Sequence, residues 1–285
     1  MLFQLAISGL SMGALYGLIA LGFVMIWNTA AVVNFAQGEL AMLAMFLAFT
    51  AHVTLGLNVW LAILLAVAGT ALLGYLFERG LVRPLVRADP LTVIMMTIGL
   101  QIFLSNGAKF IWGTQPEAFP AYFGSASLEF LGVVLSPQSL AVLGVVLVLC
   151  ILLHWMSQHT RLGKSLRAVA QDREASALMG IRIDRVVASG FAISAALAGI
   201  AGVLMAPLVF VAADVGLPLL VKSFIAAVIG GFGSYPGALI GGLLIGVLDN
   251  LVGFYISADY RDVVLFGVLI VILLFRPEGL FPKHR

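Results

Sequence analysis

The chain has 285 residues, of which 62% are hydrophobic and 10% are charged, and its formal net charge is +2. Soluble domains carry about a quarter of charged residues, so this composition excludes a soluble catalytic domain and places the chain among polytopic membrane proteins. The single cysteine, Cys150, lies in an apolar run, which excludes a disulfide framework and a cysteine-based metal site.

The first apolar run, residues 2–27, contains no charged residue. It is long enough to cross a bilayer, because about 25 residues at ~1.5 Å rise exceed a hydrocarbon core of ~30 Å. It has no basic start, so we expect a retained span and not a cleaved signal peptide. Gly9, Gly13 and Gly17 repeat every four residues, which predicts ordinary close packing of another helix on that face.

Further apolar runs follow along the chain, separated by polar or glycine- and proline-containing interruptions. They cover residues 40–54, 59–77, 91–112, 138–156, 186–206, a short run that reaches Gly230, 238–255 and 263–275. The sequence therefore predicts an all-α integral membrane protein, a helical bundle of about 8–9 transmembrane segments with some broken or re-entrant segments.

The distribution of basic residues predicts the orientation in the membrane. Twelve of the fifteen Lys and Arg residues lie in three intervals, 78–90, 161–185 and 276–285. Because cytoplasmic loops are enriched in Lys and Arg, we expect these intervals inside, the N-terminus outside and the C-terminus in the cytoplasm.

The longest polar interval, 161–185, contains the signal for one short helix. Asp172 is predicted as its N-cap, and Glu174 adds negative charge where the helix dipole favours it. Gly180 stands where a left-handed residue ends a helix. Roughly two turns are too short to be stable alone, so we expect this helix to dock onto a cytoplasmic motor protein. The predicted contact residues, within a coupling segment 157–185, are Arg167, Asp172, Arg173, Glu174, Ala177, Leu178, Met179 and Gly180.

Two interruptions of the hydrophobic pattern occupy corresponding places in the two halves of the chain. Interrupted segments of this kind are the best sequence indication of a transport path, because unpaired backbone groups need water or protein around them. The residues predicted to line or frame this path are Asn34, Gln37, Gly38, Glu39, Gly230, Gly231 and Gly233.

Ionisable groups within the apolar part are few, and for each we expect a structural role before a transport role. Asp214 and Lys222 flank Pro218, so we expect both in an aqueous break. Asp249 is expected among helices, paired with Asn250 or with a backbone group.

Motifs of known enzyme classes are absent from the sequence. Gly163-Lys164-Ser165 resembles the end of a Walker A loop, but Gln158 stands where that motif needs its first glycine. GxSxG and HExxH do not occur, and the four histidines lack ligand spacing, so we expect neither catalysis nor a metal site. The basic residues flank the membrane spans, which does not favour nucleic-acid binding.

Several motifs together resemble those of bacterial branched-chain amino acid ABC transporter permeases of the H type, over essentially the whole chain. They are NFAQGELAML at 34–43, RPLVRADPLTVIMMTIGL at 83–100, GKSLRAVAQDREASALMGI at 163–181, GGFGSYPGALIGGLLIGVLDN at 230–250 and RPEGLF at 276–281. One departure is Gln37, where family members often have histidine.

The resemblance implies an ATP-driven importer that moves amino acids, most simply Leu, Ile and Val, into the cytoplasm by alternating access. Its other parts would be an M-type second permease, two ATPase subunits that bind ATP and Mg, and an external substrate-binding protein. No cofactor is expected in this chain, and its remaining contacts would be with membrane lipid and not with nucleic acid. Three alternatives stay open: a permease for another amino acid, an amide or urea; an ion-coupled secondary transporter; and a non-transporting membrane scaffold.

Overall fold

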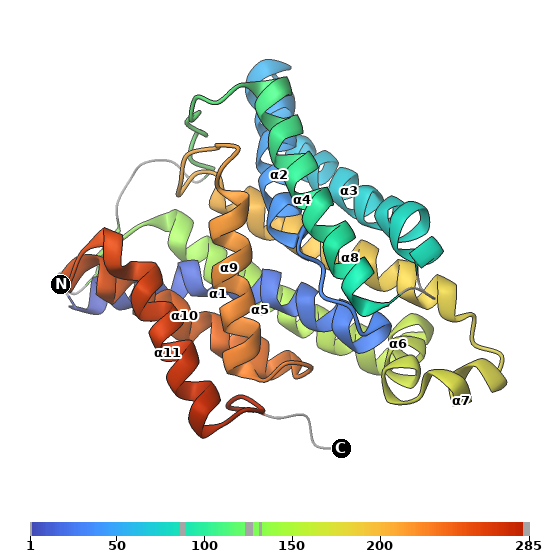
Figure 1. The fold of residues 1–285 in the computed structure, drawn as a ribbon. Helices are drawn as coiled ribbons and strands as arrows, with labels where there is room; N and C mark the ends of the chain where they lie inside the picture. Colours follow the sequence, from blue (N-terminus) through green and yellow to red (C-terminus); the bar gives the residue numbers. More distant parts are fainter. Residues whose placement is uncertain (1, 86–88, 123–127, 131–132, 282–285) are drawn as a thin grey trace.

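A computed structural model describes residues 2–85, 89–122, 128–130 and 133–281, which form one bundle of helices (Figure 1). Arg87 and the tail residues Lys283 and Arg285, part of the basic intervals used to predict orientation, lie outside the described residues. Among the described residues, strand structure is limited to a small antiparallel hairpin of β1 (Leu128–Phe130) and β2 (Val133–Leu135) and one isolated bridge between Glu117 and Val211. The predicted all-α class is therefore confirmed.

Six helical stretches of the described residues are long and apolar enough to span a membrane. They contain α1 (Leu2–Ala30), α3 (Val59–Phe77), α4 (Pro90–Trp112), α5 (Pro137–His159), α8 (Ile183–Met205) and α10 (Tyr235–Tyr255). Three shorter apolar helices accompany them: α2 (Gln37–Phe49), α9 (Gly216–Gly230) and α11 (Arg261–Phe275). Helices α2 and α9 match the predicted broken segments, whereas α11 corresponds to the last predicted membrane segment, 263–275. The number of complete crossings stays a prediction.

Helices α2 and α3 are each extended by irregular helical turns. The π-helix η1 (Thr50–Thr54) continues α2, and the π-helix η2 (Glu78–Val82) followed by the 3-10 turn η3 (Arg83–Leu85) continues α3. The turn η4 (Ala258–Tyr260) leads into α11.

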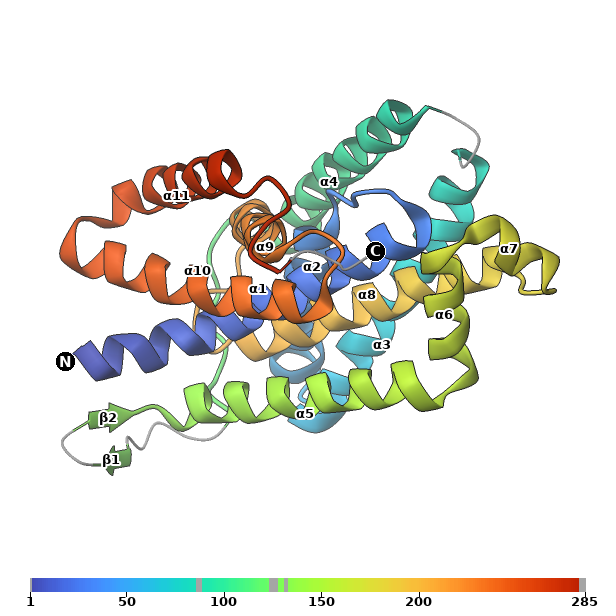
Figure 2. The same ribbon diagram turned by 90° about the horizontal axis from the view of Figure 1, so that it is seen from below.

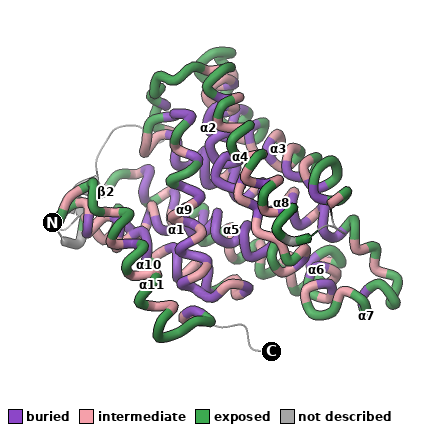
Figure 3. Tube along the Cα trace, viewed as in Figure 1, coloured by how far each residue is buried: buried purple, intermediate pink, exposed green. Residues whose placement is uncertain are grey.

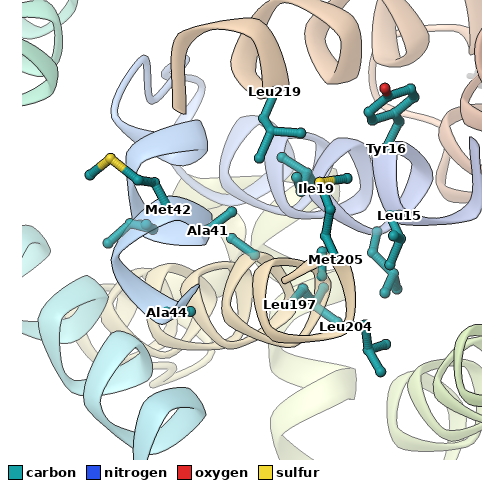
Figure 4. Packing of buried hydrophobic residues seen from close by; sticks show 14 of the residues in the cluster. Leu15, Tyr16, Ile19, Ala41, Met42, Ala44, Leu197, Leu204, Met205 and Leu219 are labelled. Atoms are coloured by element: carbon teal, nitrogen blue, oxygen red, sulfur yellow. The ribbon is translucent and has the colours of Figure 1, made fainter. Parts of the chain in front are cut away.

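The core lies where α1, α2, α8 and α9 meet. Figure 4 shows Leu15 and Ile19 of α1, Ala41 of α2, Met205 of α8 and Leu219 of α9 converging there. The peripheral helices α3, α4, α5 and α11 instead expose large apolar side chains, as expected for surfaces that face lipid. Figure 3 shows the same division, with buried segments at the centre and exposed ones at the edges.

The glycine repeat of α1 packs against α10, as predicted. A Cβ at Gly9 would lie 2.8 Å from Cα of Val247, and one at Gly13 would lie 2.6 Å from the carbonyl oxygen of Gly242. On α10, a Cβ at Gly246 would overlap the backbone of Gly13. The two helix backbones are therefore in direct contact, which maximises van der Waals packing within lipid.

Candidate functional site

The predicted docking element is held between α5 and α8 at one end of the bundle (Figure 2). It consists of α6 (Arg161–Gln171) and α7 (Arg173–Leu178). Thr160 caps α6 by accepting a hydrogen bond from the backbone N–H of Gly163 at 3.0 Å. A Cβ at Gly163 would overlap the backbone of Met156, so α6 rests directly on the end of α5.

Sequence reasoning missed α6, because the interval was read only as polar. The signal in the sequence is that apolar and basic residues lie on different faces of the helix. Leu166 and Val169 are buried and pack against Val186 of α8, while Arg161 and Lys164 are exposed. Such an amphipathic pattern is typical of a helix at a surface.

The helix α7 has the predicted caps. Oδ1 of Asp172 accepts a hydrogen bond from the N–H of Ala175 at 2.9 Å. At the other end Gly180 has φ +80°, its N–H donates to the carbonyl of Ala177, and the N–H of Ile181 donates to the carbonyl of Ser176. These two bonds form a Schellman motif, which ends the helix and turns the chain toward α8.

Apolar side chains on α7 lie in the open. Leu178 is 88% exposed and Met179 is 84% exposed, and Ala177 and Glu174 are exposed as well. In Figure 1, α7 is at the edge of the molecule, beside α6. A six-residue helix whose last residue, Leu178, and C-cap, Met179, are exposed large apolar side chains is a surface that a partner protein can cover.

The remaining predicted docking residues lie nearby but not all on α7. Arg167 belongs to α6, where its Nη1 donates to Oε1 of Gln158 at 2.8 Å. Arg173 lines a cleft of about 330 Å³ together with Thr29 of α1 and Gly233. The structure thus brings one predicted docking residue next to one predicted path residue.

The first predicted path segment, 34–39, is buried in the bundle. Gln37 is fully buried and its Nε2 donates to the carbonyl of Ser194 in α8 at 3.0 Å. The Asn34 side chain accepts from the N–H of Ala36 and donates to the Gln37 side chain. A Cβ at Gly38 would overlap the Gly216 carbonyl, so α2 and α9 approach each other closely.

Glu39 is placed at the beginning of α9. Its carboxylate lies against Gly216, where a Cβ would overlap it, and its Oε2 has no hydrogen-bond partner among the described residues. A carboxylate at a helix N-terminus is stabilised by the helix dipole. Both α2 and α9 thus begin inside the bundle, each after a break in the chain.

The second predicted path segment lies between α9 and α10. A Cβ at Gly230 would overlap the carbonyl of Gly237, and one at Gly231, which has φ +109°, would lie 2.6 Å from the carbonyl of Phe281. The carbonyl of Gly233 accepts a hydrogen bond from Nδ2 of Asn28 at 2.9 Å. These glycines permit a tight turn that packs against α1 and the end of the chain.

The side chain of Phe224 lies close to an aromatic ring in each of the two interruptions. The ring of Phe224 in α9 lies 6.1 Å from that of Phe35 and 5.8 Å from that of Phe232. The two segments paired by sequence reasoning are therefore neighbours in space, and their role in lining a path stays a prediction.

Two predictions about the ionisable groups are wrong. Lys222 does not lie in an aqueous break: its Nζ contacts Oδ1 and Oδ2 of Asp249, both at 2.9 Å, and the two side chains are 13% and 8% exposed. The hydroxyl of Tyr16 donates to Oδ2 of the same carboxylate at 3.2 Å. Asn250, the partner proposed for Asp249, donates instead to the carbonyl of Leu5. Asp214 is exposed.

A bundle of membrane-spanning helices in which two interrupted segments meet is typical of polytopic transport proteins. Residues 5–273 match the family described as branched-chain amino acid transport system / permease component, and the chain belongs to this family.

The names of individual proteins with similar sequences agree with this family. The chain is 36% identical to the high-affinity branched-chain amino acid transport system permease protein BraD of Pseudomonas aeruginosa, over 98% of this chain and 95% of that protein. It is 35% identical to the permease protein LivH of Escherichia coli strain K12, with the same coverage. It is also 26% identical to LivM of Salmonella typhimurium, over 81% of this chain and 59% of that protein.

Proposed function

We propose that the chain is the membrane-spanning permease subunit of an ATP-driven ABC importer that carries branched-chain amino acids (Leu, Ile and Val) into the cytoplasm. The names of BraD and LivH, two relatives matched over nearly their whole length, support this substrate class. The chain itself is not an enzyme in this proposal. ATP and Mg are bound by partner ATPase subunits, and the permease needs no cofactor.

The proposed assembly has five protein subunits. This chain pairs with an M-type permease, a choice supported by the similarity to LivM, and the pair binds two ATPases and an external substrate-binding protein. Residues 1–285 form one permease domain, with the coupling segment 157–185 facing the cytoplasm.

The proposed orientation places α7 inside the cell. The basic residues of η2, η3, α6 and the start of α8 lie at the α7 end of the bundle, as the positive-inside rule requires. The N-terminus and η4 are then outside, and the C-terminus is in the cytoplasm.

The exposed, capped helix α7 is the observation that carries the proposal. A displacement of α7 is transmitted to α8 through the short turn at Gly180. It is transmitted to α5 through the contact of α6 with Met156. Helix α8 in turn contacts the first broken segment through Ser194 and Gln37. ATP binding by the partner subunits favours one position of α7, which shifts the population between inward- and outward-open states.

The proposed route runs past the interior ends of α2 and α9. Because the external binding protein supplies affinity, the route itself needs no strong charged site for the substrate. Asn34, Gln37, Gly38 and Glu39 and the glycines at 230, 231 and 233 frame this route in the proposal.

The test is reconstitution of the chain with its permease partner, ATPases and binding protein in vesicles. Leu, Ile and Val are expected to stimulate ATP hydrolysis and to accumulate, whereas stimulation by another amino acid, an amide or urea alone would overturn the substrate class. Uptake by this chain alone, driven by an ion gradient, would overturn the importer mechanism.

A matched pair of variants tests the role of α7. The double charge reversal Asp172→Lys and Glu174→Lys removes the N-cap and reverses the dipole interaction, so ATP hydrolysis should no longer drive uptake. The control reversal Asp259→Lys lies in η4 at the other end of the bundle and should leave coupling intact. Equal coupling in both variants would contradict the assignment of α7.

A further inference from the structure

A groove of about 900 Å³ lies between the end of α3 and the beginning of α8. Its lining side chains come from α3 and its π-helical and 3-10 extensions on one wall, and from α8 and the residue before it on the other. The groove does not include α7, α2 or α9, although Arg182 and Arg185 belong to the predicted coupling segment 157–185. The charged residues that line it are Glu78, Arg79, Arg83, Arg182, Asp184 and Arg185.

Arginine side chains dominate this groove. Four arginines face two carboxylates, so the lining has a formal net charge of +2. Arg83 forms an ion pair with Asp184, and Nη1 of Arg79 donates to the hydroxyl of Tyr75 at 3.1 Å. Arg182 and Arg185 have no side-chain hydrogen bond to any described residue. Two guanidinium groups are thus available for an anion, and planar guanidinium groups recognise phosphate oxygens well.

The floor of the groove is built by an irregular turn. Glu78 is 2% exposed, and its Oε2 lies without a hydrogen-bond partner among the described residues, while the next residue, Arg79, is exposed. The π-helical turn η2 starts at Glu78. Single π-helical turns are frequent at functional sites.

An apolar stripe leads into the groove from the membrane side. Leu72, Leu76, Arg79 and Arg83 follow each other at spacings of three or four residues, so they share one face of the helical segment. Leu72 is 58% exposed and Leu76 is 50% exposed, and Tyr75, an aromatic residue of the kind found at membrane interfaces, lies beside the arginines. An occupant with acyl chains along Leu72 and Leu76 would carry its headgroup to the level of Arg79.

We propose that this groove binds the headgroup of an anionic phospholipid, with Arg182 and Arg185 as the main phosphate ligands. Basic pockets between membrane helices fit such headgroups. A lipid with two phosphates, such as cardiolipin, balances the net charge of the lining and is the preferred ligand. Because Arg182 is the N-cap of α8 and Arg185 lies in its first turn, bound lipid would fix the start of α8 and, through the short connection to α7, the position of the docking helix.

The experiment is native mass spectrometry of the delipidated full-length chain, titrated with cardiolipin, phosphatidylglycerol or phosphatidylcholine. Cardiolipin is expected to bind most tightly and phosphatidylcholine least. The variant Arg182→Gln/Arg185→Gln is expected to lose about tenfold or more in cardiolipin affinity. The control Arg161→Gln/Lys164→Gln removes two exposed charges at the same end of the bundle but outside the groove, and it should bind as the wild type does.

A second variant should act in the opposite direction. Asp184→Asn frees Arg83 from its ion pair and removes one negative charge, which raises the formal net charge of the lining by one. Cardiolipin affinity should therefore rise severalfold. Equal losses in the groove variant and the control variant would mean non-specific attraction and would overturn the proposal. Unchanged binding in the groove variant would overturn it as well.

Two further outcomes identify other ligands and would each overturn the lipid assignment. Inorganic phosphate that displaces cardiolipin at low concentration would indicate a site for free anions. A groove variant that keeps its lipid but no longer assembles with the ATPases would indicate a protein-docking surface.

Discussion

Replacing Asp249 by asparagine leaves the ammonium group of Lys222 buried without its counter-ion. Both carboxylate oxygens lie 2.9 Å from Nζ of Lys222, and both side chains are mostly buried. Breaking a buried pair by removing one partner costs about 3–5 kcal/mol, whereas replacing both partners by apolar groups of similar size is often neutral. We therefore expect Asp249→Asn and Lys222→Met each to destabilise the fold by about 3 kcal/mol or more, a factor of ~10² or more in the folded population.

The double variant Lys222→Met/Asp249→Leu should recover much of this loss, because it removes both charges together. It leaves the buried hydroxyl of Tyr16 without its acceptor, so it should remain about 1–3 kcal/mol less stable than the wild type. The assay measures unfolding in detergent. Unfolding is monitored through the reaction of a thiol dye with Cys150, the only cysteine of the chain. The double-mutant cycle then gives the coupling energy between the two sites. If the losses of the two single variants simply add in the double variant, the two side chains do not interact as the structure shows, and the reasoning is refuted.

Three further predictions concern the helix contact, the docking helix and the path. Gly246→Val forces a side chain into the backbone of α1 and should cost about 1–3 kcal/mol or more in the same unfolding assay, whereas Gly144→Val, with open space around it, should cost less than about 1 kcal/mol. Gly180→Ala places a Cβ at φ +80°, a strain of about 1–2 kcal/mol, and should lower the ratio of uptake to ATP hydrolysis. Asn34→Leu and Gly231→Val should each reduce uptake in reconstituted vesicles. Unchanged rates in both variants would remove the two interruptions from the proposed path.

Local chemistry was predictable from the sequence. The caps of α7 depend on Asp172 and Gly180, whose side-chain and backbone preferences act within a few residues, and both were found as expected. The apolar runs likewise predicted most helices closely, and α3 has the predicted bounds of 59–77. The glycine spacing in α1 predicted a close helix contact, although not its partner α10.

Contacts between distant parts of the chain were not predictable in this way. Lys222 and Asp249 lie 27 residues apart on different helices, and Tyr16 lies 233 residues from Asp249. The neighbouring Pro218 favoured a polar break near Lys222. The sequence does not show which helices pack together, so the ion pair between Lys222 and Asp249 could not be predicted. The groove between α3 and α8 was missed for the same reason, since its two pairs of arginines are about a hundred residues apart.

The measurement that tests the central claim most directly is cross-linking from α7 to a partner ATPase. In a Cys150→Ala background, Met179→Cys provides a single thiol at the exposed C-cap of α7, and Ala258→Cys provides one at the opposite end of the bundle. The account predicts that Met179→Cys forms an adduct with the ATPase subunit, that ATP changes its yield, and that Ala258→Cys forms none. Labelling of Met179→Cys by an impermeant reagent from outside the cell, or no adduct with the ATPase in the assembled complex, would contradict it.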